Sequence, residues 1–179
     1  MTAFNANEVS DQQLDWTILR DGGVALYWRP EVLADDLDGL QSSGYQVTEF
    51  DTSQWKNEEH MHESLKSALS FPDYYGMNLD ALDECMCDDV EVPDRGGLIL
   101  VLRRYDRFAR KVQIHASSER RLAEIVLHIF AGAVRYHVLF GRRLMILVQS
   151  DDPQLRFGNL APVFADWNPR EWLAQNRGL

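Results

Sequence analysis

LILVL at residues 98–102 is an unbroken apolar run, and LMILV at residues 144–148 is a second one. Continuous apolar runs of this length are typical of strands that are covered on both faces. Residues 45–51 (YQVTEFD) alternate between apolar and polar side chains, which predicts a further strand. Helical patterns separate the three segments. The sequence therefore predicts an α/β fold with a small, largely parallel sheet of about three core strands, joined by right-handed crossovers.

Five stretches show apolar residues at the spacing of a helix. Asn78 is a good N-cap for the third of them, and Ser117 or Ser118 for the last. The expected helices begin at Pro30 and end at Gly44, carry Met61, Leu65 and Leu69 and stop before Pro72, and cover residues 79–88, 105–114 and about 119–140.

The N-terminal region predicts a different element. Residues 16–20 (WTILR) and 24–28 (VALYW) flank Asp21-Gly22-Gly23, a pattern that favours a β-hairpin with a short turn. Residues 1–14 are interpreted as a loose terminus. The hairpin either extends the edge of the sheet or stands apart from it.

The charge of the chain is divided unevenly between its two halves. The net charge is −10, but residues 1–99 carry 21 acids against 5 Lys or Arg (net −16), whereas residues 100–179 carry 7 acids against 13 bases (net +6). An acidic half repels nucleic acid and attracts a basic protein partner. Acids that serve only solubility are the alternative.

Several features predict a cytoplasmic protein without cofactor, metal or membrane partner. We find no leader pattern and no apolar stretch that approaches a membrane span. Cys85 and Cys87 are two residues apart, so on a helix they point in different directions and disfavour a disulfide. His60 and His62 are also two apart, so they do not face one metal ion; a solvated helix face is the favoured interpretation.

A basic cluster follows the apolar run at residues 98–102. Without interleaved aromatic residues it is interpreted as a solvated helix face rather than a nucleic-acid site, although it could also pair with the acidic half or with a second copy. Its members are Arg103, Arg104, Arg107, Arg110 and Lys111.

Residues 71–94 (FPDYYGMNLDALDECMCDDVEVPD) carry the strongest functional signal. The acids Asp80, Glu84 and Asp88 are stacked at i, i+4 and i+8 of the expected helix, and Asp83 occupies another face. Seven acids and no Lys or Arg lie between Asp80 and Asp94. Like charges at this spacing destabilise a helix, and a cationic partner would compensate for that.

An aromatic loop precedes the acidic helix. Tyr74 and Tyr75 are candidate anchors for a protein partner, and Gly76 permits a tight turn between loop and helix. The alternative is that one tyrosine belongs to the core and the acids are only surface.

The string from Pro72 to Cys85 resembles the signature of the barstar-like family of intracellular ribonuclease inhibitors. The resemblance extends more weakly over residues 44–150. It implies a barstar-like core there, with residues 1–43 as an N-terminal extension and residues 151–179 as a C-terminal extension. We expect one globular unit, and the aromatic tail (Trp167, Trp172) should pack back onto the core.

The resemblance also implies roles for single residues. Tyr74 would contact the nuclease, Asp80 would face an arginine, and Glu84 would occupy the phosphate site of the enzyme. Two positions depart from the family pattern: it has Asp where this chain has Glu84, and an aromatic residue where this chain has Asp83. A further family acid falls near Ala131 or Gly132 and is not carried over.

The sequence therefore predicts a binding protein, not an enzyme, that blocks the basic active site of a secreted or toxin-type ribonuclease. In the free state we expect a monomer or weak dimer. An acidic regulator of a non-nuclease protein is the alternative, and a metal-dependent enzyme ranks last. The predicted partner-binding residues are Tyr74, Tyr75, Gly76, Asp80, Asp83, Glu84 and Asp88.

Overall fold

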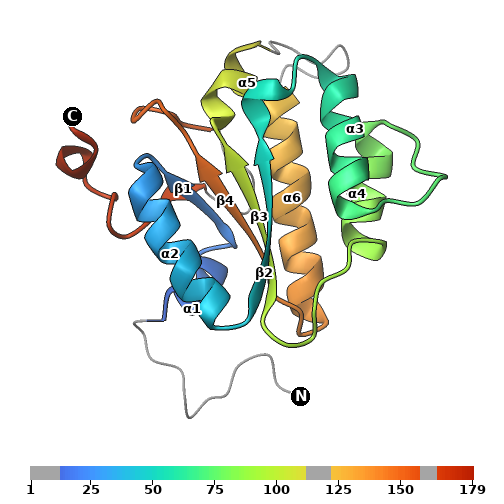
Figure 1. The fold of residues 1–179 in the computed structure, drawn as a ribbon, viewed down its shortest axis with the longest axis horizontal. Coiled ribbons are helices and arrows are strands. Elements are labelled where there is room, and N and C mark those ends of the chain that lie inside the picture. The colour runs from blue at the N-terminus through green and yellow to red at the C-terminus, as the bar shows by residue number, and fades with distance from the viewer. Residues whose placement is uncertain (1–12, 112–121, 158–164) are drawn as a thin grey trace.

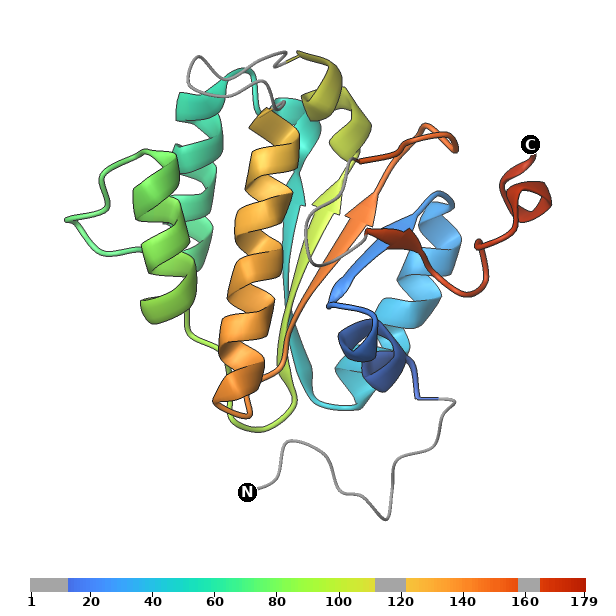
Figure 2. The ribbon, with the colours of Figure 1, turned by 180° about the vertical axis from the view of Figure 1, so that it is seen from behind.

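The computed structural model describes residues 13–111, 122–157 and 165–179. In this part of the chain a parallel sheet has the strand order β2-β3-β4-β1-β5. Helices cover both faces of the sheet (Figure 1, Figure 2). The predicted parallel α/β fold is confirmed. The strands are β1 (Val24–Tyr27), β2 (Tyr45–Asp51), β3 (Gly97–Arg103), β4 (Leu144–Gln149) and β5 (Asp166–Trp167).

The helices form two layers around the sheet (Figure 1, Figure 2). One layer holds α1 (Leu14–Arg20) and α2 (Pro30–Ser42). The other holds α3 (Glu58–Leu69), α4 (Leu79–Asp88) and α6 (Leu122–Leu139). The shorter helices are α5 (Tyr105–Lys111), at the carboxyl ends of the strands, and the 3₁₀ turns η1 (Thr52–Gln54) and η2 (Ala174–Arg177).

The buried strands explain why the sheet is covered on both sides. Along β3, Leu98, Leu100 and Leu102 pack into the core below α3, α4 and α6. The intervening Ile99 and Val101 pack into the core below α1 and α2. Because side chains alternate across a strand, a continuous apolar run supplies both cores at once.

The sheet is wider than the predicted three strands. The three expected strands are adjacent as β2, β3 and β4. β1 then pairs with β4 over residues 24–27, and β5 pairs with β1 through Asp166 and Trp167. The two terminal extensions therefore supply the strands beyond β4.

The predicted hairpin at residues 16–28 is wrong. Residues 14–20 form α1, and the segment from Val24 is a parallel strand. The Gly23 N–H donates to the Ile18 carbonyl at 2.7 Å, and Gly22 and Gly23 have φ angles of 104° and 78°. The two glycines therefore end a helix and do not form the predicted hairpin turn.

The other predicted helices are confirmed, with small changes at their ends. α4 has the predicted bounds, and α5 is described from Tyr105 to Lys111, where this described range of the chain stops. The proposed caps Ser117 and Ser118 lie outside the described residues. By length and composition alone, α6 could cross a membrane. However, 56% of its 18 residues are buried inside the protein, as in a core helix.

The C-terminal tail is fastened by a buried carboxylate. Glu171 accepts hydrogen bonds from the backbone N–H groups of Trp28 and Arg29, both at 2.9 Å, and from Asn168 Nδ2 at 2.7 Å. Glu171 is fully buried, whereas Trp172 is 57% exposed. Polar contacts of Glu171 and the β5 pairing, rather than Trp172, hold the tail to β1.

Candidate functional site

The loop before α4 is shaped by its close approach to the helix cap. Asn78 caps α4 by accepting the Ala81 N–H at 2.9 Å, and its amide donates to the Gly76 carbonyl at 3.2 Å. A Cβ at Gly76 would lie 3.0 Å from that amide nitrogen. The positive φ of the turn is at Met77 (52°), not at Gly76. Gly76 therefore serves the turn by leaving room for the Asn78 amide.

Tyr74 is the exposed aromatic residue of this loop. Its side chain is 74% exposed, and its hydroxyl donates to Asp89 Oδ1 at 2.6 Å. This hydrogen bond to a carboxylate raises the pKa of Tyr74 to about 12, with smaller contributions from desolvation and from the Asp89 charge. The bond ties the loop to the carboxyl end of α4 and presents the ring to solvent.

Tyr75 does not share this exposure. It is 4% exposed and packs against Phe71 and His62. Burial raises the pKa of Tyr75 well above its ordinary value, so its hydroxyl is protonated, and this hydroxyl shares a hydrogen bond with His62 Nδ1. Its side chain therefore supports the loop from within, and its predicted use as an exposed anchor is corrected.

The prediction that His62 lies on a solvated helix face is wrong. His62 is fully buried on α3, and its Nε2 lies 3.6 Å from Glu58 Oε1. Desolvation lowers the pKa of His62, partly offset by Glu58. Its spacing to Leu65 and Leu69 (i+3 and i+7) places it on the apolar face of α3, and this signal could have identified it as a support for the loop.

The acids near the start of α4 are available to a partner. Asp80, Asp83 and Glu84 are all exposed. Within the described residues, no ion pair or hydrogen bond joins their carboxylates to a Lys or Arg. The opposite side of the helix is anchored in the core by Leu82 and Met86. A rigid helix thus presents three carboxylates to solvent.

Asp88, the last predicted acid, has a partner within the protein. Its Oδ1 accepts the hydroxyl hydrogen of Tyr136 on α6 at 2.8 Å. The Tyr136 ring in turn packs against Phe140 at 5.0 Å between centroids. Asp88 and Asp89 are therefore held by tyrosines from two different elements. No local pattern in the sequence indicates this role of Tyr136, because its contact joins residues 48 positions apart.

The two cysteines are free thiols, with Cys85 buried and Cys87 half-buried. Burial is the largest cause that raises the pKa of Cys85 to about 12, and a hydrogen bond to Asp89 acts in the same direction. Burial likewise raises the pKa of Cys87 to about 11. Both side chains are therefore protonated and unreactive at neutral pH.

No group of three or more His, Cys, Asp or Glu side chains in the described ranges is arranged to hold a metal ion. The described arginines of the basic cluster are each paired with an acid. Arg107 pairs with Asp151 and Arg110 with Asp152, both at 2.8 Å. Such neutralised cations form a surface ion-pair belt, which is a poor match for a phosphate backbone.

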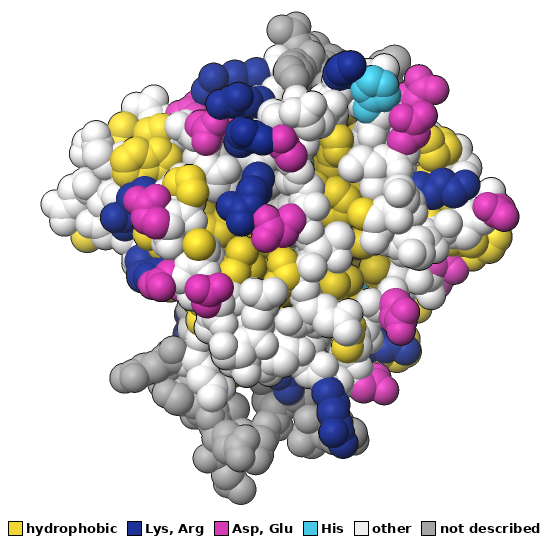
Figure 3. Space-filling view, viewed as in Figure 1, with side chains coloured by type: hydrophobic (Ala, Val, Ile, Leu, Met, Phe, Trp, Pro, Cys, Tyr) yellow, Lys and Arg dark blue, Asp and Glu magenta, His cyan; other side chains and the backbone are white. Residues whose placement is uncertain are grey.

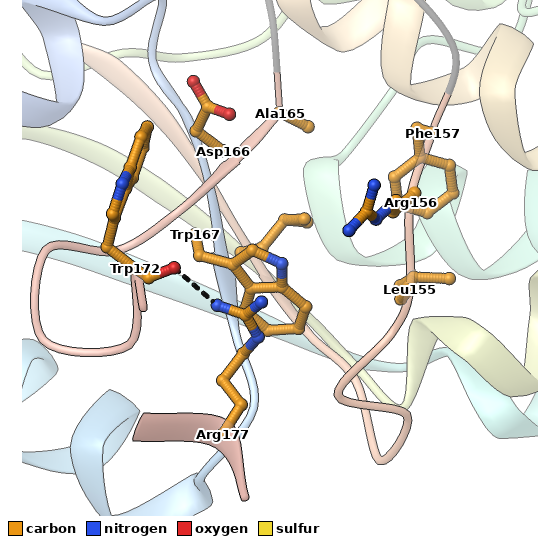
Figure 4. Close-up of a pocket in the computed structure, with 9 residues that line it drawn as sticks. Leu155, Arg156, Phe157, Ala165, Asp166, Trp167, Trp172 and Arg177 are labelled. Atoms are coloured by element: carbon orange, nitrogen blue, oxygen red, sulfur yellow. Dashed lines mark hydrogen bonds between the residues drawn. The ribbon is translucent and has the colours of Figure 1, made fainter. Parts of the chain in front are cut away.

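A concavity of about 310 Å³ lies beside the tail (Figure 4). At its base, the Arg177 guanidinium stacks on the Trp167 ring at 4.6 Å. Arg177 also donates to the carbonyls of Pro153 at 3.1 Å and Trp172 at 2.8 Å. This arginine fastens the tail, so we assign the concavity a structural role.

Comparison with known proteins agrees with this geometry. The sequence model described as Barstar (barnase inhibitor) matches residues 45–149, which are 105 of the 179 residues. The chain belongs to the barstar family. The matched segment runs from β2 to the end of β4 and contains the aromatic loop and α4.

A Bacillus subtilis (strain 168) protein named "Putative ribonuclease inhibitor YrdF" is 45% identical over 56 residues. The match covers 31% of this chain and 57% of that relative, so the barstar-family chain spans little more than half of the relative's length. β1 and β5 lie outside the family match, as do α1 and α2.

Proposed function

We propose that this barstar-family protein inhibits a cognate ribonuclease by placing α4 and Tyr74 over the basic active site of the enzyme. Glu84 stands at the centre of this surface, with Asp80 and Asp83 beside it. The observation that carries the proposal is that these exposed carboxylates have no basic partner among the described residues. The family match and the name of the relative support a ribonuclease as the target.

The mechanism is substitution of a carboxylate for a phosphate. A ribonuclease gathers cationic side chains and hydrogen-bond donors where the phosphate and its developing charge must be stabilised. A Glu84 carboxylate in that position accepts charge-assisted hydrogen bonds, which are bidentate where an arginine is suitably oriented. The exposed acids attract the basic enzyme over long distance, and the desolvated pairs at the centre slow its release.

The rigidity of the surface supports this mechanism. Asn78 fixes the start of α4, and the Tyr74 and Tyr136 hydroxyls fix its last turn through Asp89 and Asp88. Groups that are already held in place lose less conformational entropy on binding. Glu84 is one methylene longer than the Asp of the family pattern, so we expect the cognate nuclease to have a deeper cationic site.

The role follows from the target. A host that makes a toxic ribonuclease requires an inhibitor in the compartment where its own RNA lies. We therefore propose a cytoplasmic immunity or antitoxin protein that is a monomer or weak dimer when free. Two free, protonated thiols suit a reducing compartment.

The test begins with capture of a partner on the affinity-tagged full-length chain from its native host, followed by an RNA-cleavage assay of the captured protein. We expect a basic protein whose RNA cleavage stops when the chain is added in equal amount. Glu84→Ala should lose most of the inhibition, while Glu91→Ala, a change of an exposed acid beyond the helix, should retain it.

The proposal is overturned if folded Glu84→Ala and Asp80→Ala variants inhibit as well as the wild-type chain. A captured basic protein that does not cleave RNA would instead support the alternative, an acidic regulator of a non-nuclease partner.

A further inference from the structure

β2 forms one edge of the sheet, and no strand among the described residues pairs with its outer side. Its seven residues pair only with β3, from Tyr45 opposite Gly97 to Asp51 opposite Arg103. Within the described ranges, residues 46–50 make no other backbone hydrogen bond. A long edge of this kind presents a row of free N–H and C=O groups to any extended chain that reaches it.

A groove of about 550 Å³ runs between this edge and α3. Phe50 and Trp55 form its apolar floor together with Ala68 of α3. Figure 3 shows this face of the molecule, where apolar surface is exposed among the charged side chains. The polar wall on the α3 side consists of His60, Glu63, Ser64 and Ser67.

The charges around the groove favour a cation at one position. Glu49 is paired with Arg103 at 2.5 Å, and Asp51 is paired with Arg104. Glu63 lies exposed on α3 and has no ion pair with a described cation. The groove is therefore nearly neutral along β2 and carries a free carboxylate on the opposite wall.

We infer that this groove binds an extended segment of another protein, which adds to β2 as a further strand. A polypeptide is the occupant that satisfies alternating free N–H and C=O groups along an edge. One of its side chains, of small apolar type, would cover the floor at Ala68, and a Lys or Arg would face Glu63. None of the α4 acids lines this groove, so the site is separate from the proposed nuclease-binding surface.

The site can be tested with a phage-displayed library of random linear peptides as the probe. We expect enrichment of peptides that combine an apolar residue with a Lys or Arg on one face of a strand. Binding of a selected peptide should slow amide hydrogen exchange in residues 46–50. Ala68→Trp, at an exposed position, should fill the groove and abolish binding.

A matched pair of charge reversals on α3 separates specific binding from general attraction. Glu63→Lys should weaken peptide binding about tenfold or more, because a charge-assisted contact becomes a repulsion. Glu59→Lys changes the same charge on the same helix outside the groove and should leave the affinity unchanged.

Three results would overturn the inference. They are a library that yields no enriched peptide, selected peptides that bind Ala68→Trp as tightly as the wild-type chain, and a dimer in analytical ultracentrifugation that Ala68→Trp dissociates. The last result would assign the groove to a second copy of the chain.

Discussion

The Tyr74 hydroxyl donates a hydrogen bond of 2.6 Å to Asp89, which connects the tip of the aromatic loop to the residue that follows α4. Tyr75, the next residue, is buried and its hydroxyl shares a hydrogen bond with the buried His62. Two adjacent tyrosines therefore fix the loop from outside and from inside. This arrangement makes the loop a rigid part of the proposed inhibitory surface.

The hydrogen bond between Tyr74 and Asp89 predicts a measurable shift in the pKa of Tyr74. The pKa of Tyr74 rises from 10.0 to about 12, chiefly because the protonated hydroxyl donates to Asp89. Asp89→Asn should return it toward the ordinary tyrosine value. NMR titration of ring-labelled tyrosine measures this change. Asp73→Asn, at an exposed acid of the same loop, is the control and should leave the titration of Tyr74 where it is.

The burial of His62 beside Tyr75 predicts that the stability of the protein depends on pH. The pKa of His62 lies below its ordinary value of 6.5 in the folded protein, chiefly through desolvation. The unfolded chain therefore binds more protons near and below pH 6.5, so stability is full above that pH and falls as the pH drops through the folded pKa. Urea unfolding at a series of pH values should show this loss, and His62→Gln should reduce it.

His137 is also buried with a lowered pKa, so part of the pH dependence should remain in the His62→Gln variant. His60→Gln, at a half-buried histidine on the same helix, is the matched substitution with which the unfolding curves of His62→Gln are compared. An identical slope in wild-type and His62→Gln proteins would contradict the assignment.

Glu171 predicts a large loss of stability for a residue outside the family match. Glu171→Ala leaves the N–H groups of Trp28 and Arg29 without their acceptor, and should destabilise the protein by about 3 kcal/mol. Glu31→Ala, at an exposed acid in the first turn of α2, should change stability by less than about 0.5 kcal/mol. Denaturant unfolding of the two variants compares them directly.

Two glycines should respond to the same substitution with opposite signs. A Cβ at Gly23 would lie 2.3 Å from Val134 Cγ1, and its φ is +78°, so Gly23→Ala should destabilise by about 1–3 kcal/mol. Gly39 lies within α2 with nothing within 4 Å of an added Cβ, so Gly39→Ala should stabilise by about 0.5–1 kcal/mol. Thermal and denaturant unfolding give both values.

The acids of the proposed surface should affect different rate constants. Asp94→Asn, at the exposed end of the acidic segment, should slow association with the captured nuclease and reduce its salt dependence. Glu84→Asp should speed dissociation, because the shorter side chain withdraws the carboxylate from its site. Surface plasmon resonance at several salt concentrations separates the two effects, and equal changes in both rates would argue against a central Glu84.

The sheet and α4 could be predicted because their signals are local. LILVL and LMILV identify buried strands by composition alone, and Asn78 marks the start of α4 by its capping chemistry. The hairpin prediction around Asp21-Gly22-Gly23 is wrong because helix ends and hairpin turns both favour glycines. The bond from Gly23 to Ile18, which closes the end of α1, is the kind of contact that distinguishes the two.

The parts of the site that the sequence missed depend on long-range contacts. Tyr75, and not Tyr74, is the buried tyrosine that contacts His62. His62 lies on α3, 13 residues before Tyr75. The Tyr136–Asp88 contact depends on how α6 packs beside α4. The spacing of His62 to Leu65 and Leu69 indicates that His62 is buried, but not which tyrosine it contacts. The Tyr136–Asp88 contact has no periodicity or motif in the sequence, so a pattern in one segment cannot indicate it.

The strand order also has a consequence for synthesis of the chain. β1 is made early, but its neighbours β4 and β5 include residues 144–149 and 166–167. Until these leave the ribosome, β1 has no partner in the sheet, whereas β2 and β3 can pair much sooner. The pair of β2 and β3 can therefore form first on the ribosome, β1 can join the sheet only after β4 has emerged, and β5 completes the sheet at the close of translation.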